Sequence, residues 1–487
     1  MIRFRLVISV IGIILQGFSA LMAIPVIVAM LMRQNDSVFA FLLCLLTGML
    51  FGRLAWRASS SKDFDDLNRM EGIVAASMSW IAVATAGAIP YMCFGMGFVD
   101  ALFESMSGFT TTGATVLFDY TVLNGSMFFY RGYTQWIGGM GILVLFVAVL
   151  PHLAISGRQL FFAETSSASQ EKLTPRISDT ARRLWGWYFF LTALMSAMLY
   201  FTGMPLNDAV SNSFGTLAAG GFSPHPLSIM GYENSAAEWV TIVFMFLAGA
   251  NFTLQVKCLH GNFASFFRNP EFRLYLTIVL VSSLLLVVVL TRYNAVTGSI
   301  VDALRIAMFQ NISIMTTTGS ATADFELWSG GAKSILLVLM FIGGCSGSAG
   351  GGPKVVRILL LFRYLGKVLL KIVQPNAVVT VKLARSTFKE SEVQPVFSFV
   401  VLYFLFFAIG GTIATLIEND FTVGFTGAIA TLGNIGPGFG KLGPMGSFYD
   451  LNWFTKVLYT FLMWAGRLEI MAVAVFFRQE LWRDSKW

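Results

Sequence analysis

The chain has 487 residues, of which 56% are hydrophobic and only 12% are charged, and its formal net charge is +7. Soluble domains carry about 25% charged residues, so this composition excludes a soluble globular protein and indicates a polytopic membrane protein. The basic residues lie between apolar segments and not on one soluble face, which fits the positive-inside rule and argues against a nucleic-acid partner.

Ten apolar segments are long enough to cross a bilayer as helices, which takes about 20 residues each. The first is too long for a signal peptide and has no cleavage site, so we expect a spanning helix there. Lysine and arginine gather in alternate connections and at both ends of the chain, so alternating spans place both termini in the cytoplasm. The predicted spans are 7–31, 38–56, 73–98, 131–152, 185–204, 238–258, 274–292, 333–362, 395–417 and 452–477.

Four connections on the opposite side are too short to cross and share one pattern. Each begins with an aspartate, which suits a helix N-cap, and ends in the phrase TTTGAT, AAGGFS, TTTGSAT or GNIGPG. The order of span, short helix, glycine loop and span therefore occurs four times, after a prefix of two spans. The short segments are 99–119, 207–226, 301–325 and 420–440, and their aspartates are Asp100, Asp208, Asp302 and Asp420.

The glycine phrases suit a path for a cation. Non-helical backbone at membrane depth is tolerated only where it is buried in protein or lines a water-filled path. Loop carbonyls can replace the water around a cation, and glycine permits the backbone torsions that such a loop needs. The aspartates would raise the cation concentration at the outer mouth, a role that is compatible with capping.

The eighth span contains the phrase GGCSGSAGGGPK at residues 343–354, which predicts a break in the helix because glycine and proline disfavour it. The alternative is a cytoplasmic linker after a short helix. The preceding apolar run, 333–342, is too short to span alone, so we place the break inside the membrane, under the glycine loops.

The last span contains WAGRLEIM, which puts Arg467 and Glu469 in apolar surroundings. Charge there is costly and often functional, although a structural ion pair is the alternative. Cys44, Cys93, Cys258 and Cys345 are scattered and show neither a disulfide framework nor a metal-site spacing.

Taken together, the four phrases in this order resemble the TrkH/TrkG/KtrB superfamily of potassium-transporting membrane subunits, with TrkH-type proteins the nearest match. The resemblance covers essentially the whole chain. It implies an all-α polytopic membrane protein in which two transmembrane helices precede four helix–pore helix–filter loop–helix repeats in a pseudo-fourfold arrangement, and it implies a homodimer. The expected divisions are a prefix at 1–70 and repeats at 71–157, 158–265, 266–390 (with a gating loop at 343–354) and 391–487.

By the same resemblance, the four glycine phrases form a K⁺ selectivity filter and the broken eighth span forms a gate. The second phrase has two adjacent glycines, and the sequence leaves open which one matches Gly113. The implied filter residues are Thr111, Thr112, Gly113, Ala219, Gly220, Gly221, Thr317, Thr318, Gly319, Asn434, Ile435 and Gly436. The implied gate residues are Gly343, Gly344, Gly347, Gly350, Gly351, Gly352 and Arg467.

We therefore expect a potassium-translocating subunit, acting as a channel or a symporter in the bacterial inner membrane and surrounded by lipid. The resemblance implies a TrkA-type cytoplasmic ring as partner, which would carry the nucleotide, and no organic cofactor on this chain. A sodium-permeable or sodium-coupled relative is the main alternative. A membrane-embedded enzyme would need titratable groups inside the pore phrases, which contain none, and a purely structural scaffold does not explain four polar loops.

Overall fold

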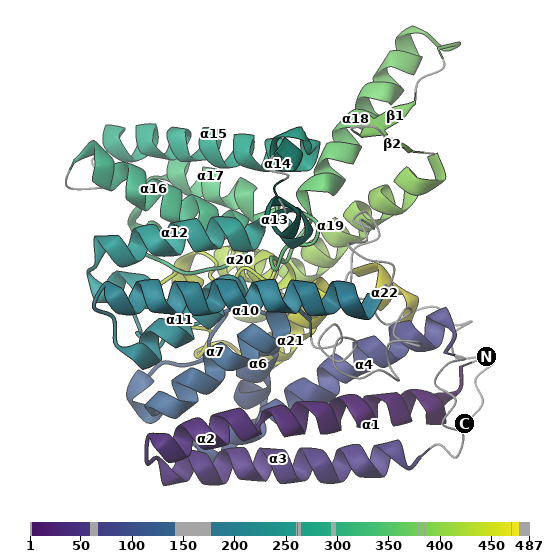
Figure 1. Cartoon of the computed structure of the whole chain (residues 1–487). Helices are drawn as coiled ribbons and strands as arrows, with labels where there is room; N and C mark the ends of the chain where they lie inside the picture. Colours follow the sequence, from purple (N-terminus) through teal and green to yellow (C-terminus); the bar gives the residue numbers. More distant parts are fainter. Residues whose placement is uncertain are drawn as a thin grey trace.

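The computed structural model describes residues 2–58, 67–141, 177–259, 261, 264–293, 299–377, 380–383, 386–388, 390–468 and 470–476. Within these ranges the chain is almost entirely helical, and the long helices run roughly parallel to one another (Figure 1). Six of these helices are long and apolar enough to cross a membrane, and a bent pair of helices makes a seventh candidate. The all-α polytopic membrane fold is therefore confirmed.

Two spans precede the repeats. The first consists of α1 (Phe4–Leu21) and α2 (Ala23–Leu31), and the second is α3 (Asn35–Trp56), which packs against both. Glycine permits this close approach, because a Cβ added at Gly12 would lie 2.5 Å from the backbone nitrogen of Trp56 and 2.6 Å from the backbone oxygen of Gly52. Small residues commonly allow helices to pack closely in membranes.

Each of the four repeats then contains a long helix, a short helix, a loop with a 3-10 turn, and a second helix. The first repeat comprises α4 (Arg69–Gly87), α5 (Ile89–Cys93), α6 (Phe98–Phe109), η2 (Tyr120–Val122) and α7 (Gly125–Gly139). The second comprises α10 (Ile177–Phe201), α11 (Leu206–Leu217), η4 (Ser228–Tyr232), α12 (Ser235–Gly249) and α13 (Phe252–Leu259), followed by α14 (Ala264–Arg268). The third comprises α15 (Pro270–Arg292), α16 (Ile300–Met315), η5 (Phe325–Leu327), α17 (Gly330–Met340) and α18 (Val355–Val373). The fourth comprises α19 (Glu390–Glu418), α20 (Phe421–Leu432), η6 (Gly440–Leu442), α21 (Trp453–Arg467) and α22 (Ile470–Phe476).

Second helices end earlier than the sequence analysis expects, except in the third repeat, where α17 ends at Met340, just before the predicted break. The break predicted at 343–354 is present between α17 and α18. The expected spans 238–258 and 452–477 are wrong as continuous helices, because α12 and α13 meet at 103° and α21 ends at Arg467. The expected span 131–152 is described only to residue 141, and α7 ends before that.

Glycines at these ends allow the second helices to lie against the short helices. A Cβ added at Gly139 of α7 would lie 2.7 Å from the Cα of Ala218, directly after α11. A Cβ added at Gly466 of α21 would lie closer than 3.0 Å to the carbonyl oxygen of Leu432, the last residue of α20. The second helices therefore end in close contact with the ends of short helices, a tertiary demand that a hydropathy pattern does not contain.

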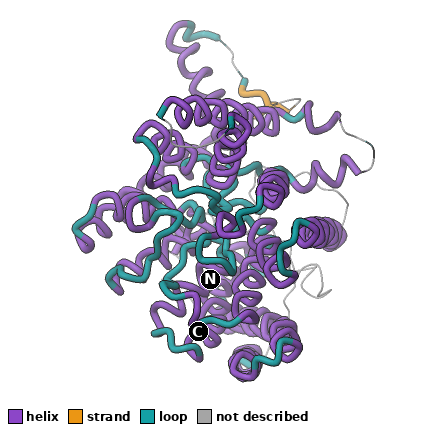
Figure 2. Tube along the Cα trace, turned by 90° about the vertical axis from the view of Figure 1, so that its left-hand side faces the viewer, coloured by secondary structure: helices purple, strands orange, loops and turns teal. Residues whose placement is uncertain are grey.

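The repeats pack around a centre. The second helix of one repeat lies against the short helix of the next where α7 meets α11 and where α12 meets α16, and α21 of the fourth repeat returns to α6 of the first. The third and fourth repeats meet where α18 packs on α19. Figure 2, turned by 90°, shows loops gathered in the middle of the surrounding helices.

One element has no counterpart in the sequence expectations. Strands β1 (Val381–Leu383) and β2 (Ser386–Phe388) form a short antiparallel hairpin between α18 and α19. It lies near α18, which projects from the body of the molecule at the upper right of Figure 1. This hairpin is small and leaves the helical character of the fold unchanged.

Replacing Gly12 by leucine should separate α1 from α3, because the new side chain meets backbone and not a flexible side chain. Overpacking of this kind typically costs about 1–3 kcal/mol. We expect a lower midpoint of thermal unfolding for the purified protein in detergent. The matched control is Gly186→Leu in α10, where an added Cβ meets no described atom within 4 Å. An equal loss in both variants would contradict the proposed close packing.

Candidate functional site

The short helices do not all begin as expected, since only one of the four aspartates is an N-cap. Asp420 caps α20, and its Oδ1 accepts the backbone N–H of Val423 at 3.1 Å. The other three lie at the third helical position, after the N-cap residues Gly97, Pro205 and Ser299. The expectation of four aspartate caps is therefore wrong for α6, α11 and α16.

Those three aspartates bind groups of the protein instead. Asp100 pairs with Lys456 of α21 at 2.7 Å, which joins the first repeat to the fourth. Asp208 accepts the hydroxyl of Tyr232 at 3.0 Å. Asp302 accepts the backbone N–H of its own N-cap residue, completing a capping box. All four carboxylates still lie in or beside the first helical turn, where the helix dipole favours negative charge.

The far ends of the short helices are identical in hydrogen bonding. After each helix, the second residue beyond the cap donates its N–H to the carbonyl five positions earlier, at 2.8 Å in every case. The residue before it donates to the carbonyl three positions earlier, which completes a Schellman motif. The five-position pairs are Thr112–Ser107, Gly220–Gly215, Thr318–Ser313 and Ile435–Ala430.

This motif places a residue in the left-handed region, where glycine is usual. Here the residue is never glycine. Two of the four are β-branched threonines, for which positive φ is a genuine outlier, and each such position costs about 1–3 kcal/mol. Strain that recurs four times in equivalent places is typical of a functional site. The residues are Thr111 (φ 53°), Ala219 (φ 56°), Thr317 (φ 58°) and Asn434 (φ 53°).

The third residue of each loop is a glycine that also has positive φ: Gly113 (82°), Gly221 (72°), Gly319 (76°) and Gly436 (101°). This pattern decides the question that the sequence leaves open. Gly221, and not Gly220, is the structural equivalent of Gly113, since both follow a left-handed residue by two positions.

The four loops close into a ring. A Cβ added at Gly113 would come closer than 3.0 Å to the carbonyl oxygen of Gly220, the middle residue of the second loop. The same relation connects the second loop to the third, the third to the fourth, and the fourth back to the first. The other pairs are Gly221 with Thr318, Gly319 with Ile435, and Gly436 with Thr112. Two separate reasons therefore require glycine at each position: its positive φ, and the carbonyl of the next loop, which leaves no room for a Cβ.

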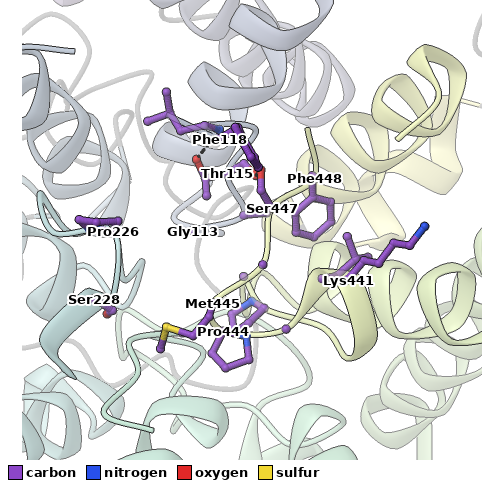
Figure 3. A pocket seen from close by; sticks show the side chains of 18 of the residues that line it. Gly113, Thr115, Phe118, Pro226, Ser228, Lys441, Pro444, Met445, Ser447 and Phe448 are labelled. Atoms are coloured by element: carbon purple, nitrogen blue, oxygen red, sulfur yellow. Dashed lines mark hydrogen bonds between the residues drawn. The ribbon is translucent and has the colours of Figure 1, made fainter. Parts of the chain in front are cut away.

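All four of these glycines line one cavity of about 450 Å³. Figure 3 shows part of its wall, where Pro444 and Met445 from the segment after η6 lie across the space from Gly113. That segment is tied to the first repeat, because the N–H of Phe448 donates to the carbonyl of Thr115 at 2.9 Å. We call this cavity the vestibule.

Beside the vestibule lies a buried ion pair that the sequence analysis missed. Arg131 of α7 and Glu104 of α6 are at most 1% exposed, and their closest N–O distance is 2.6 Å. The second oxygen of Glu104 accepts the N–H of Val116 at 3.0 Å, and the guanidinium lies 4.1 Å from the centre of the Phe222 ring. The pair thus fixes the segments that follow the first two loops. A charge in apolar sequence, the signal that singled out Arg467, applies equally to Arg131.

Two amide side chains bind the loops, one from helix α7 to the second loop and one from the fourth loop to the first. Gln135 of α7 donates from Nε2 to the carbonyl of Gly220 at 2.7 Å and accepts the N–H of Phe222 at 3.0 Å. Asn434 of the fourth loop donates to the hydroxyl of Thr112 at 2.9 Å. Among the described residues, no group of three or more His, Cys, Asp or Glu side chains is placed to hold a metal ion.

The glycine-rich segment between α17 and α18 folds into a closed hairpin-like loop. Its two ends meet where the N–H of Gly343 donates to the carbonyl of Pro353 at 2.8 Å and the N–H of Val355 donates to the carbonyl of Gly344 at 3.1 Å. Its middle is bound to the end of α12, because the N–H of Ala349 donates to the carbonyl of Ala248 at 3.1 Å.

This segment lies directly against the ends of the third and fourth loops. The N–H of Gly351 donates to the hydroxyl of the strained Thr317 at 2.6 Å. A Cβ added at Gly350 would lie 2.7 Å from the carbonyl oxygen of Thr316, and one added at Gly351 would lie 2.7 Å from that of Gly433. The structure thus brings the predicted gate residues into contact with the predicted filter residues.

Arg467, at the end of α21, reaches the same segment. Its guanidinium donates to the carbonyl of Ala349 at 3.1 Å and to the carbonyls of Gly138 and Gly139 at 2.6 and 3.0 Å. It therefore connects the glycine-rich segment to the end of α7, two repeats away. Glu469, which the sequence analysis named together with Arg467 as a charge in apolar sequence, lies outside the described residues.

Known proteins share this architecture. A model of the TrkH family, described as a cation transport protein, matches residues 37–487. The chain is 35% identical to the Trk system potassium uptake protein TrkH of Salmonella typhimurium, across 99% of this chain and 100% of that protein. It is 33% identical to the Trk system potassium uptake protein TrkG of Escherichia coli, across 99% of each.

A solved structure agrees with these sequence comparisons. The crystal structure of the potassium transporter TrkH from Vibrio parahaemolyticus matches with a TM-score of 0.88 and 34% identity, over 99% of this chain and 100% of that one. The repeat architecture, the ring of four loops and the matches over the full length agree: the chain belongs to the TrkH family of cation transport proteins.

Proposed function

We propose that this chain is the potassium-translocating membrane subunit of a bacterial Trk-type uptake system and conducts K⁺ inward. The observation that carries the proposal is the ring of four equivalent loops, whose glycines all line the vestibule. The relatives named as potassium uptake proteins support K⁺ as the ion. The matching family is described as one of cation transport proteins, which gives no support to the alternative of a membrane-embedded enzyme.

The filter would consist of the twelve loop residues, three from each repeat. A ring of backbone carbonyls and threonine hydroxyls can replace the hydration water of a K⁺ ion without a fixed charge that would retain it. The negative ends of the four short helices point to these loops and favour a cation. The ring is chemically uneven, because Ala219 and Ile435 stand where other loops have threonine. A sodium-permeable pore is therefore the alternative to test.

The glycine-rich segment 343–354 would be the gate, with Arg467 as a fixed positive charge beside it. The contacts of Gly350 and Gly351 with the ends of the third and fourth loops support this assignment. Glycine would give the segment the freedom to leave that position. A cation would then pass through the ring only after the segment moves.

The proposed oligomer and partner rest on the family resemblance and on the positive charge of the connections between spans. We propose a homodimer in the inner membrane with cytoplasmic termini, and a TrkA-type ring that carries the nucleotide and docks on the basic connections. The start of α1 and helix α22 lie at the same end of the molecule, which supports termini on one side (Figure 1). We propose the same repeat boundaries as above, at 71–157, 158–265, 266–390 and 391–487.

Replacing Gly113 or Gly319 by alanine should collapse potassium preference, because each position needs positive φ and faces a carbonyl of the next loop. A strain of about 1.4 kcal/mol already corresponds to a tenfold change in relative affinity. We would measure cation flux into liposomes, with K⁺ competed against Na⁺ and Cs⁺.

The control for this experiment is Gly97→Ala, at the N-cap of α6, where an added Cβ meets no described atom within 4 Å. Equal K⁺ and Na⁺ flux in the unmodified protein would favour the sodium-permeable alternative. Unchanged selectivity in folded Gly113→Ala and Gly319→Ala proteins would remove the loops from the filter.

Deleting residues 349–351 should raise basal K⁺ flux in the absence of any partner. The deletion removes the groups that bind Ala248, Arg467 and Thr317 but leaves the pairing of Gly343 with Pro353 available. Allosteric coupling between two sites typically corresponds to changes of about fivefold or more, and we expect an increase of at least that size. Flux equal to that of the unmodified protein, in a variant that elutes as a single species, would show that this segment is not the gate.

A further inference from the structure

Glu271, the second residue of α15, connects to both sides of the glycine-rich segment. It is only 6% exposed, although it carries a carboxylate. Its Oε1 accepts the N–H of Ser346 at 2.6 Å and the N–H of Val356 at 3.2 Å. One oxygen of this side chain therefore holds the segment before its central glycines and also holds the helix that follows them.

The same carboxylate supplies the N-terminal cap that α18 needs. The residue at the N-cap position is Lys354, whose ammonium has only donors and cannot accept an amide N–H. Val356 is the second residue of α18, so its N–H is among those that the helix itself leaves unsatisfied. Glu271 satisfies it from another helix, and its negative charge lies at the positive end of the α18 dipole.

The carboxylate also lies at the start of its own helix. The side chain of Asn269 caps α15 by accepting the N–H groups of Glu271 and Phe272, at 2.9 and 3.1 Å. Glu271 thus lies where the positive ends of α15 and α18 meet. The two N–H donors and the two helix ends offset part of the cost of burying the charge, and they do so only while α18 and the segment keep these positions.

Several other attachments of the segment join neutral groups, whereas the guanidinium of Arg467 and the ammonium of Lys354 also donate to its carbonyls, those of Ala349 and Gly350. The neutral bonds include Cys345 N–H to Gly249 carbonyl at 2.8 Å, and Gly351 N–H to Thr317 hydroxyl at 2.6 Å. Hydrogen bonds to a carboxylate are roughly twice as strong as neutral ones. The bonds made by Glu271 are therefore stronger than these neutral bonds.

We propose that Glu271 is a positioning residue that holds the gate in its closed arrangement and couples it to the α14–α15 connection. This inference rests on the proposed gate function of residues 343–354. A shift of the start of α15 moves the carboxylate away from Ser346 or Val356 and releases the central glycines. The remaining contacts with Thr317, Gly249 and Arg467 then no longer suffice to keep the segment under the loops.

Cys345 provides a direct reporter of that release, because it lies inside the segment and is 1% exposed. In a background carrying Cys44→Ser, Cys93→Ser and Cys258→Ser, the full-length protein in liposomes would be labelled with a membrane-permeant maleimide. Basal K⁺ flux would be measured on the same samples.

We expect E271A to raise the rate of Cys345 labelling by about tenfold, the scale of one hydrogen bond to a charged group, and to raise basal flux with it. E271Q keeps an oxygen acceptor but loses the charge, so its labelling rate should fall between those of E271A and the parent. E271D keeps the charge and should restore slow labelling at least in part.

The control is E71Q, which removes another buried carboxylate that accepts backbone N–H groups, here those of Arg3 and Asn68, and that pairs with the Arg3 guanidinium and has no described contact with the segment. It should label at the parental rate. Parental labelling in folded E271A and E271Q would overturn the proposal, as would equal acceleration in E71Q. Faster labelling without faster flux would confirm the anchor but overturn the gate function on which it rests.

Discussion

The structure depends on one constraint: backbone groups at helix ends inside a membrane protein must be satisfied without water. Four short helices end in the centre of this molecule, and each satisfies its last carbonyls with the same pair of hydrogen bonds. That solution forces Thr111, Ala219, Thr317 and Asn434 into the left-handed region. The same strained conformation occurs in all four loops. It gives every loop the same backbone geometry after its helix, and every loop then contacts the next one.

The ring of loops then determines the shape of its surroundings. Each ring glycine faces a carbonyl of the neighbouring loop, so the four loops form one unit with little room for side chains. The second helices approach the same region and stop there, at positions such as Gly139 and Gly466. The buried pair of Glu104 and Arg131 stabilises the segments beyond the ring, where desolvated charges must be paired.

The glycine-rich segment occupies the space that the third repeat leaves open when its second helix breaks. Its central residues form neutral bonds with the loops, whereas its flanks bind the carboxylate of Glu271. A segment whose centre and flanks are bound by different parts of the protein suits an element with two arrangements. Arg467 adds a third connection, from the segment to the end of α7, so several repeats contribute to its position.

The sequence by itself determined the membrane class, the two-span prefix, the four repeats and the break at 343–354. These features depend on hydropathy and on glycine or proline content, which a short stretch of sequence already contains. It also singled out the twelve loop residues and Arg467. Only the tertiary structure decided that Gly221 matches Gly113, that three aspartates are not caps, and that the second helices end early. Glu104 and Arg131 are 27 residues apart in the chain, and Glu271 and Ser346 are 75 apart. Such pairs form because folding removes water from both partners at once, and no local pattern encodes which distant group will satisfy a buried charge.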